Sequence, residues 1–340
     1  MVILTLIDDE GEECCGYEVR NCSQKGRGVF ATKEYAPGDV IFDEMPAVMA
    51  PRDREVSCFH CAKPLESINQ AASRLQRKRI KIFEIIPMNE TPDVIEDQAT
   101  ELKFCSTKCF KEANDNYLNA LRGKWKEYKS IENWIRVNKG PPHDQATLLA
   151  ITKMMCMKQQ KSKLVEDFED MTSDRPLPNI EKFTKAVHTR FKSQNVFLEN
   201  SHYDLLKYAE ICGANFQLGT TSAIAPWIKR LKDIKCLERI QHAKLLKDFK
   251  DFDARAKKKY QEYLRNTGAQ PTQSAAPHIA SEFRALYAMH SKINHSCSPN
   301  VKVKMLENSS KVAIIALTPI SLEDELCHGL KLIEKALSLS

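Results

Sequence analysis

The sequence has no uninterrupted apolar run of 18 residues, so it predicts no membrane-spanning helix. It also has no basic leader before its apolar start, Met1–Ile7, which is short and is followed by the acidic Asp8. Such a start is too short for a signal peptide and is typical of a first β-strand. We therefore expect a soluble intracellular protein, located in the cytoplasm and nucleus, whose 12 cysteines are reduced.

A strong charge of one sign is also missing. The 51 basic and 45 acidic residues leave a net charge of +6, which is too small to indicate nucleic-acid binding. The sequence shows no internal repeat, no tandem fingers and no basic recognition helix, which argues against sequence-specific DNA binding. The basic stretch Arg74–Lys81 is typical of a solvated helix face, with a nuclear signal or a peptide-docking patch as alternatives.

Short strands and turns are expected at both ends of the chain. In residues 1–50, Gly26 and Gly28 are expected to share one turn, and Pro37–Gly38 to form another. Strands are expected at residues 39–42, 301–305 and 311–317.

The middle of the chain has helical patterns. Residues 144–163 predict a helix with buried methionines. Residues 227–265 are highly charged with spaced apolar residues, so they predict either one long amphipathic helix or two shorter ones. A polar loop is expected at 266–278. A length of 340 residues favours two or three domains.

Four cysteines stand in two close pairs, Cys58 with Cys61 and Cys105 with Cys109. Thiolates two or three residues apart can hold Zn²⁺ from one turn, and two such pairs complete a tetrahedral site. The 43 residues between the pairs are many for a simple finger. The spacing therefore predicts a zinc site, with reduced thiols in a core or loop as the alternative.

Two further segments lie about 270 positions apart. The first is Lys25-Gly26-Arg27-Gly28, in which glycines on either side of an arginine permit tight backbone turns beside a ligand. The second is Asn294-His295-Ser296-Cys297-Ser298-Pro299, which offers amide donors and acceptors before a proline. In this order and separation they resemble the two halves of a SET domain, the fold of protein-lysine methyltransferases that use S-adenosylmethionine.

The cysteine segments resemble a MYND zinc finger, and a SET domain interrupted by such a finger is typical of the SMYD family. A MYND finger usually holds two zinc ions. Here the resemblance matches the ligands of the first ion, whereas those of the second are missing from residues 62–104 and 118–122. The resemblance therefore implies one structural zinc, with His60 as a loop residue outside the site.

The SMYD resemblance also implies roles for single residues around S-adenosylmethionine. It implies catalytic roles for Tyr287 and His295. It implies cofactor contacts by Lys25, Gly26, Arg27, Gly28, Asn215, Ser291, Ile293, Asn294 and His295.

An α+β organisation follows from the same resemblance, with small sheets, a pseudoknot, a finger and a helical insert. The expected parts are residues 1–57 and 283–330 for the two SET halves, 58–122 for the finger, 123–282 for the helical linker and insert with a cofactor-contact segment at 205–222, and 331–340 for a tail.

The sequence departs from the family pattern at its C-terminus. Leu330 stands where the family has a catalytic tyrosine, and the cysteine-rich post-SET segment is missing. His328 is expected to be an exposed loop residue, with a substitute polar role as the alternative.

Two hypotheses follow. The first is a protein-lysine N-methyltransferase, active as a monomer on histone tails or other basic proteins, including ribosomal proteins. The second is a catalytically weak SET and MYND scaffold that binds a peptide partner through its finger. The arginine and the two asparagines predicted to contact the cofactor favour the first hypothesis, whereas Leu330 and the missing segment favour the second.

Overall fold

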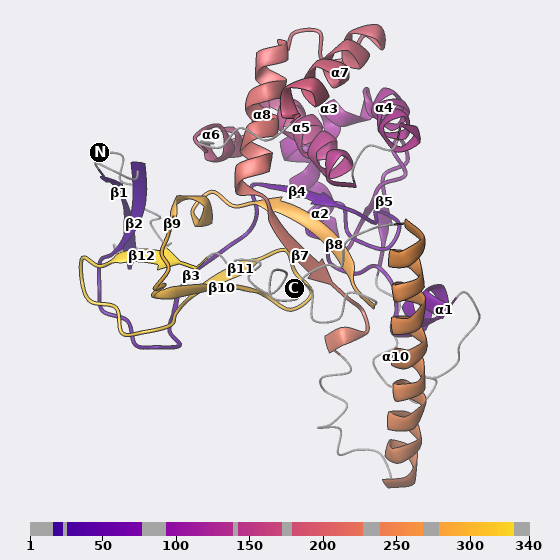
Figure 1. Ribbon diagram of the computed structural model, residues 1–340. Coiled ribbons are helices and arrows are strands. Elements are labelled where there is room, and N and C mark those ends of the chain that lie inside the picture. Colours follow the sequence, from indigo (N-terminus) through magenta and orange to yellow (C-terminus); the bar gives the residue numbers. More distant parts are fainter. Residues whose placement is uncertain are drawn as a thin grey trace, which may run out of the picture.

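The computed structural model describes residues 16–22, 26–76, 93–138, 142–171, 179–226, 239–267 and 279–329 (Figure 1). The expectations for Met1–Ile7, Lys25, Leu330 and the tail lie outside the described residues, as does most of the basic stretch that begins at Arg74.

The largest sheet brings the two ends of the described chain together. Its strands run in the order β1-β2-β12-β10-β11-β3, and β9 also pairs with β12. The strands are β1 (Tyr17–Cys22), β2 (Gly26–Ala31), β3 (Val40–Glu44), β9 (Asn294–His295), β10 (Val301–Met305), β11 (Val312–Ala316) and β12 (Glu325–His328). The strands expected at 39–42, 301–305 and 311–317 are therefore confirmed; the bounds of the second agree, and those of the other two differ by one or two residues.

The glycines near the N-terminus differ from expectation. Gly26 has a φ of +74° at the start of β2, which is a conformation that glycine adopts without strain. Gly28, however, lies within β2 and pairs with Arg20 of β1, so the two glycines do not share one turn. The sequence shows the glycines but not the partner strand, and strand pairing decides the backbone here.

A second sheet has three strands from distant parts of the chain. Its order is β4-β8-β7, where β4 is Val48–Pro51, β8 is Ser281–Leu286 and β7 is Gln217–Thr221. Gly219 pairs with Phe283 across β7 and β8, and the aromatic ring fills the space that a Cβ atom would need.

The finger and the helical insert share one hydrophobic core. The finger contains α1 (Ile68–Gln76), β5 (Ile95–Glu96), β6 (Lys103–Phe104) and α2 (Thr107–Ala113). The insert contains η1 (Asn114–Leu118), α3 (Asn119–Arg122), α4 (Trp125–Val137), α5 (Pro142–Gln160), α6 (Leu164–Glu169), α7 (Ile180–Ser193) and α8 (His202–Asn215). Helix α5 confirms the helix predicted at 144–163, and its methionines at 154, 155 and 157 are buried as expected.

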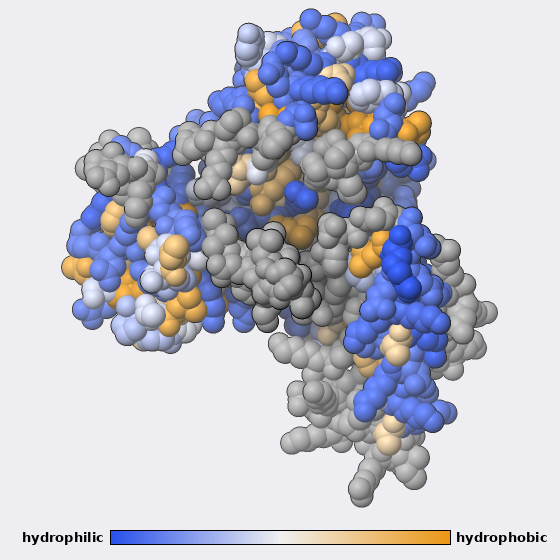
Figure 2. All heavy atoms as spheres, viewed as in Figure 1, coloured by the Kyte–Doolittle hydropathy of each residue, from blue (hydrophilic) through white to orange (hydrophobic). Residues whose placement is uncertain are grey.

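Helix α10 (Arg239–Thr267) stands apart from this core. It is one continuous helix over its described length. Residues 227–238 of the predicted helical region, and most of the predicted loop at 266–278, lie outside the described residues, so the choice between one long helix and two shorter ones stays open. Phe249, Phe252 and Ala256 are buried, and α10 contacts α1. Elsewhere it extends away from the body in Figure 1, and its visible face in Figure 2 is mostly hydrophilic.

Within the described part of the chain, no helix combines the length and apolar character that crossing a bilayer requires. A short 3₁₀ turn, η3 (His290–Lys292), leads into β9.

Candidate functional site

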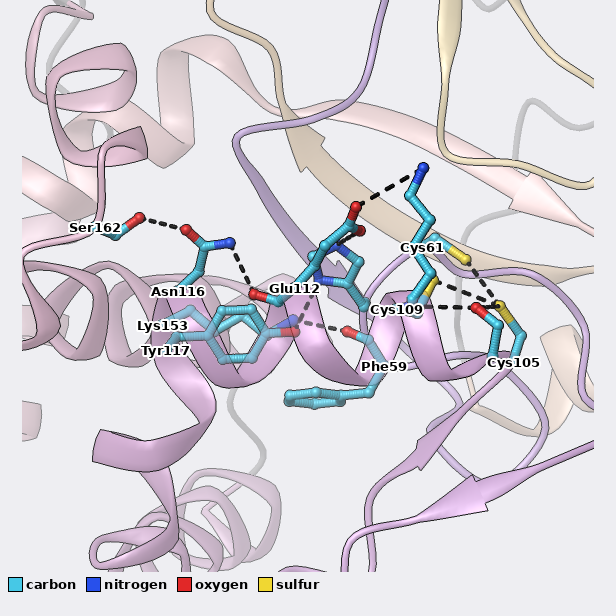
Figure 3. A network of polar contacts seen from close by, with 12 residues as sticks. Phe59, Cys61, Cys105, Cys109, Glu112, Asn116, Tyr117, Lys153 and Ser162 are labelled. Carbon is cyan, nitrogen blue, oxygen red and sulfur yellow. Dashed lines mark hydrogen bonds and ion pairs between the residues drawn. The ribbon is translucent and has the colours of Figure 1, made fainter.

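The four predicted cysteines meet at one point. Cys58 and Cys61 come from a turn that precedes α1, Cys105 stands just before the N-cap of α2, and Cys109 lies in its first turn. All four sulfur atoms lie within 4.8 Å of one another. Figure 3 shows three of these cysteines, in which Cys105 Sγ is 3.5 Å from that of Cys61 and 3.6 Å from that of Cys109. A tetrahedral Zn²⁺ with Zn–S distances of about 2.3 Å needs sulfurs about 3.8 Å apart, so this donor set fits one zinc.

Local structure explains how α2 presents its cysteine. Ser106 caps α2, and its hydroxyl accepts a hydrogen bond of 3.2 Å from the backbone N–H of Cys109. His60 points elsewhere, because its Nε2 lies 3.1 Å from a Glu112 carboxylate oxygen. His60 is therefore outside the sulfur cluster, as the resemblance implied. Hydrogen bonds from Cys105, Cys109 and Cys61 hold the pKa of Cys58 below its ordinary value.

A buried lysine lies beside this cluster. Lys153 of α5 is 1% exposed, and its ammonium donates to the carbonyls of Met49 and Phe59 at 2.6 and 2.9 Å. The same nitrogen lies 3.9 Å from the centre of the Phe59 ring and 4.7 Å from that of Tyr117 (Figure 3). Burial lowers the pKa of Lys153 to about 7, and the charge of Cys58 opposes this effect. The sequence analysis did not identify Lys153 as a site residue. A single lysine among the apolar residues of a helix that is expected to be buried could have indicated it.

The second candidate site lies where β2 and β9 meet β12. Leu326 of β12 pairs with Val29 of β2, and Cys327 pairs with Asn294 of β9. The Asn294 amide donates to the Arg27 carbonyl at 3.1 Å and to the Glu325 carboxylate at 2.7 Å. The structure therefore brings together the two segments that stand some 270 positions apart.

Charged side chains meet at the edge of this site. The Arg27 guanidinium donates to both the carboxylate and the backbone carbonyl of Asp170, which follows α6. Lys292 lies 3.8 Å from the same carboxylate, and its side chain is 10% exposed. Lys292 was missed from sequence even though it stands between the predicted contacts Ser291 and Ile293. Asp170 carried no local signal, because its contact with Arg27 spans 143 positions.

A partly buried glutamate holds the turn before Asn294. The carboxylate of Glu44 accepts hydrogen bonds from the backbone N–H groups of Met289 and His290 at 2.8 and 3.0 Å. Burial raises the pKa of Glu44. Within the turn, the Ser291 hydroxyl donates to the Ala288 carbonyl at 2.9 Å, and Ile293 is buried. The backbone that precedes β9 is therefore held from two sides.

The remaining predicted residues have varied surroundings. Asn215 ends α8, where its amide donates to the Ile211 carbonyl at 3.0 Å. His295 is exposed, with Nε2 3.9 Å from Cys297 Sγ. Tyr287 is fully buried, its hydroxyl donates to the Ser310 carbonyl, and burial raises its pKa. A catalytic role for Tyr287 stays a prediction.

His328 differs from expectation, because it lies on β12 and is half-buried instead of being exposed on a loop. Its ring centre is 5.2 Å from that of His290, which is buried. Burial lowers the pKa of both rings, that of His290 to about 4. The fold, and not the local sequence, places this pair of imidazoles beside β9.

Comparison with known proteins agrees with this geometry. A family model of the SET domain matches residues 26–329. The chain belongs to the SET domain family. Its relatives include proteins named protein-lysine N-trimethyltransferase SMYD5 from Homo sapiens, Gallus gallus and Danio rerio. The human protein is 24% identical over 340 residues, which cover 90% of this chain and 76% of the relative. The chicken protein is 23% identical with the same coverage, and the zebrafish protein is 23% identical over 89% of this chain and 76% of its own length.

The predicted α+β SET fold and the resemblance to the SMYD family are thereby confirmed. The cysteine cluster agrees with the single zinc site that the resemblance implied. The individual cofactor and catalytic roles stay predictions, because the comparisons name no residues.

Proposed function

We propose that this protein is an S-adenosylmethionine-dependent protein-lysine N-methyltransferase. The observation that carries the proposal is the junction of β2 and β9 on β12, where the Asn294 amide donates to the Arg27 carbonyl. Membership of the SET domain family and the names of the relatives support the same activity.

The residues at this junction fit the cofactor by charge and polarity. S-adenosylmethionine carries a carboxylate, an ammonium and a sulfonium, and supplies the methyl group when bound. Arg27 and Lys292 are cations for its carboxylate, and Asn294 and backbone carbonyls are polar partners for its other groups. For direct transfer, the substrate lysine must be neutral and aligned with the methyl group, so this chain acts mainly by positioning and by excluding water.

The finger has a structural part in this proposal. Cys58, Cys61, Cys105 and Cys109 would hold one Zn²⁺, and four thiolates leave no open position for catalysis. We propose histone tails or other basic proteins, including ribosomal proteins, as substrates, and action in the cytoplasm and nucleus. A peptide partner at the finger and a monomeric state belong to the same proposal.

The first test is a calorimetric titration of zinc-loaded protein with S-adenosylmethionine. We expect saturable binding that Asn294→Ala abolishes, because the amide that links Arg27 to β12 is lost. The matched control is Asn300→Ala, since Asn300 also bonds to β12 through the Glu325 carbonyl and the Cys327 N–H but is not a predicted contact. Melting curves would verify that all three proteins are folded at the titration temperature.

Methyl transfer to histone or ribosomal proteins is then assayed with labelled cofactor. Transfer by the wild type supports the enzyme. Cofactor binding without transfer to any of these proteins would favour the scaffold hypothesis, which the leucine at position 330 motivates. A folded protein that does not bind the cofactor would overturn the proposed function.

A further inference from the structure

Most of the net charge of this chain lies in one helix. Helix α10 contains nine basic and four acidic residues. Since the whole chain has 51 basic and 45 acidic residues, the remainder has 42 and 41 and is almost neutral. The net charge of the whole chain is too small to indicate a polyanionic partner, but almost all of it lies on this single helix.

The charge is also sorted onto one side of α10. The buried stripe is formed by Phe249, Phe252 and Ala256, and α10 contacts α1. Because an α-helix has 3.6 residues per turn, the position of this stripe determines which residues lie on the opposite side of the helix. Among the described side chains, that side carries two exposed acidic residues, Asp251 and Glu262, and seven exposed basic ones: Lys244, Lys247, Lys250, Arg255, Lys257, Lys258 and Arg265.

Few of these cations form an ion pair with another described residue. Lys257 pairs with Asp253 at 2.6 Å along the helix. Lys247, Lys250 and Lys258 form no ion pair with any described residue and project from the face opposite the stripe. A solvated helix usually mixes both signs on its free face, often as Glu and Lys pairs four residues apart. The excess of cations on α10 instead raises the local positive potential.

We propose that the basic face of α10 binds the phosphate backbone of duplex DNA without reading its sequence. From Lys244 to Arg265 the face is about 32 Å long at 1.5 Å per residue, which is close to one turn of B-form DNA. The helix extends from the body in Figure 1, and the seven basic side chains on this face are exposed. The major groove of B-form DNA admits a helix, whereas that of A-form RNA is too narrow. Lysines that contact phosphates hold the duplex but carry no sequence information.

The test is fluorescence anisotropy of the zinc-loaded 340-residue chain with two unrelated 20-base-pair DNA duplexes between 50 and 200 mM salt. We expect equal affinity for both sequences, in the range of about 1–100 µM, and a steep loss with salt. The variant Lys247→Gln/Lys250→Gln/Lys258→Gln should bind at least about tenfold more weakly, with a salt slope reduced by about three.

The matched control is Lys111→Gln/Lys126→Gln/Lys182→Gln, which removes the same charge from exposed positions outside α10. It should bind DNA within about twofold of the wild type if the charge on α10 acts locally. Equal losses in the two variants, or no binding by the wild type, would overturn the proposal. Tighter binding of a poly-glutamate peptide or of an RNA duplex than of DNA would also overturn it, in favour of an acidic protein surface or of RNA.

Discussion

At the scale of single residues, Asp170 occupies the two cations that are proposed to bind the cofactor carboxylate. The Asp170 carboxylate pairs with Arg27 and lies near Lys292, the two cations proposed to receive the cofactor carboxylate. Two carboxylates cannot share these cations without repulsion. In this structure Asp170 therefore acts as an internal competitor for the proposed cofactor group.

We predict that Asp170→Asn binds S-adenosylmethionine about threefold to tenfold more tightly, because the ion pair no longer has to be broken. The measurement is the dissociation constant by calorimetry. Binding of 5′-methylthioadenosine, which has no carboxylate, should stay unchanged in the same variant. Asp251→Asn on α10 is the matched control for the loss of one exposed charge.

Weaker binding by Asp170→Asn would contradict this prediction, and would indicate that Asp170 contacts the cationic groups of the cofactor. An unchanged affinity would also contradict it, and would leave Asp170 as a contact that only links α6 to the sheet.

At the scale of elements, the pairing of β7 with β8 depends on a missing side chain. Gly219 pairs with Phe283, and a Cβ atom at Gly219 would lie 2.1 Å from Phe283 Cζ and 2.7 Å from Met305 Cε. Glycine in a strand normally costs stability because of its backbone entropy. Here it makes room for a fully buried ring, so packing and not propensity explains the residue.

We predict that Gly219→Ala lowers the free energy of unfolding by roughly 1–3 kcal/mol, because the added methyl group forces the buried ring to move. The measurement is the urea midpoint and slope. The control is Leu218→Ala on the same strand, where the side chain is 43% exposed and the change should stay within about 0.5 kcal/mol. A stabilised Gly219→Ala variant would show that the ring has an alternative position.

At the scale of the whole molecule, the finger and the helical insert form one folding unit. Their buried residues belong to a continuous core, and Lys153 of α5 donates to the Phe59 carbonyl beside Cys58. Removal of zinc would leave four clustered thiols without their ion, three of them buried, so the disturbance should extend from the finger into α5.

We predict about one zinc per chain in the reduced protein, and loss of that zinc in Cys109→Ser. Amide hydrogen exchange should then speed up in α5 as well as in the finger, because both share the core around Phe59. Cys297→Ser, which changes an exposed cysteine, should keep both the zinc and the protection. Zinc-free wild-type protein with full protection, or faster exchange confined to the finger, would contradict the prediction.

Local patterns were sufficient for several features. The spacing within each cysteine pair predicted a metal site, since ligands two or three residues apart already lie on one turn. The apolar residues of α5 predicted its helix for the same reason, because their period is a property of neighbouring residues. The SET resemblance rested on two short segments, and the strand order of the sheet later brought these segments into contact.

Other features depended on contacts between distant parts of the chain. The partners of Arg27 and Lys153 are 143 and 94 positions away, and β1 draws Gly28 into a strand. The small net charge became a basic face on α10 only when burial of Phe249 and Phe252 fixed which side of the helix meets solvent. The sequence by itself determined the chemistry that is available and the local elements that carry it. The tertiary structure decided which groups meet, because burial, strand pairing and ion pairing all depend on partners far along the chain.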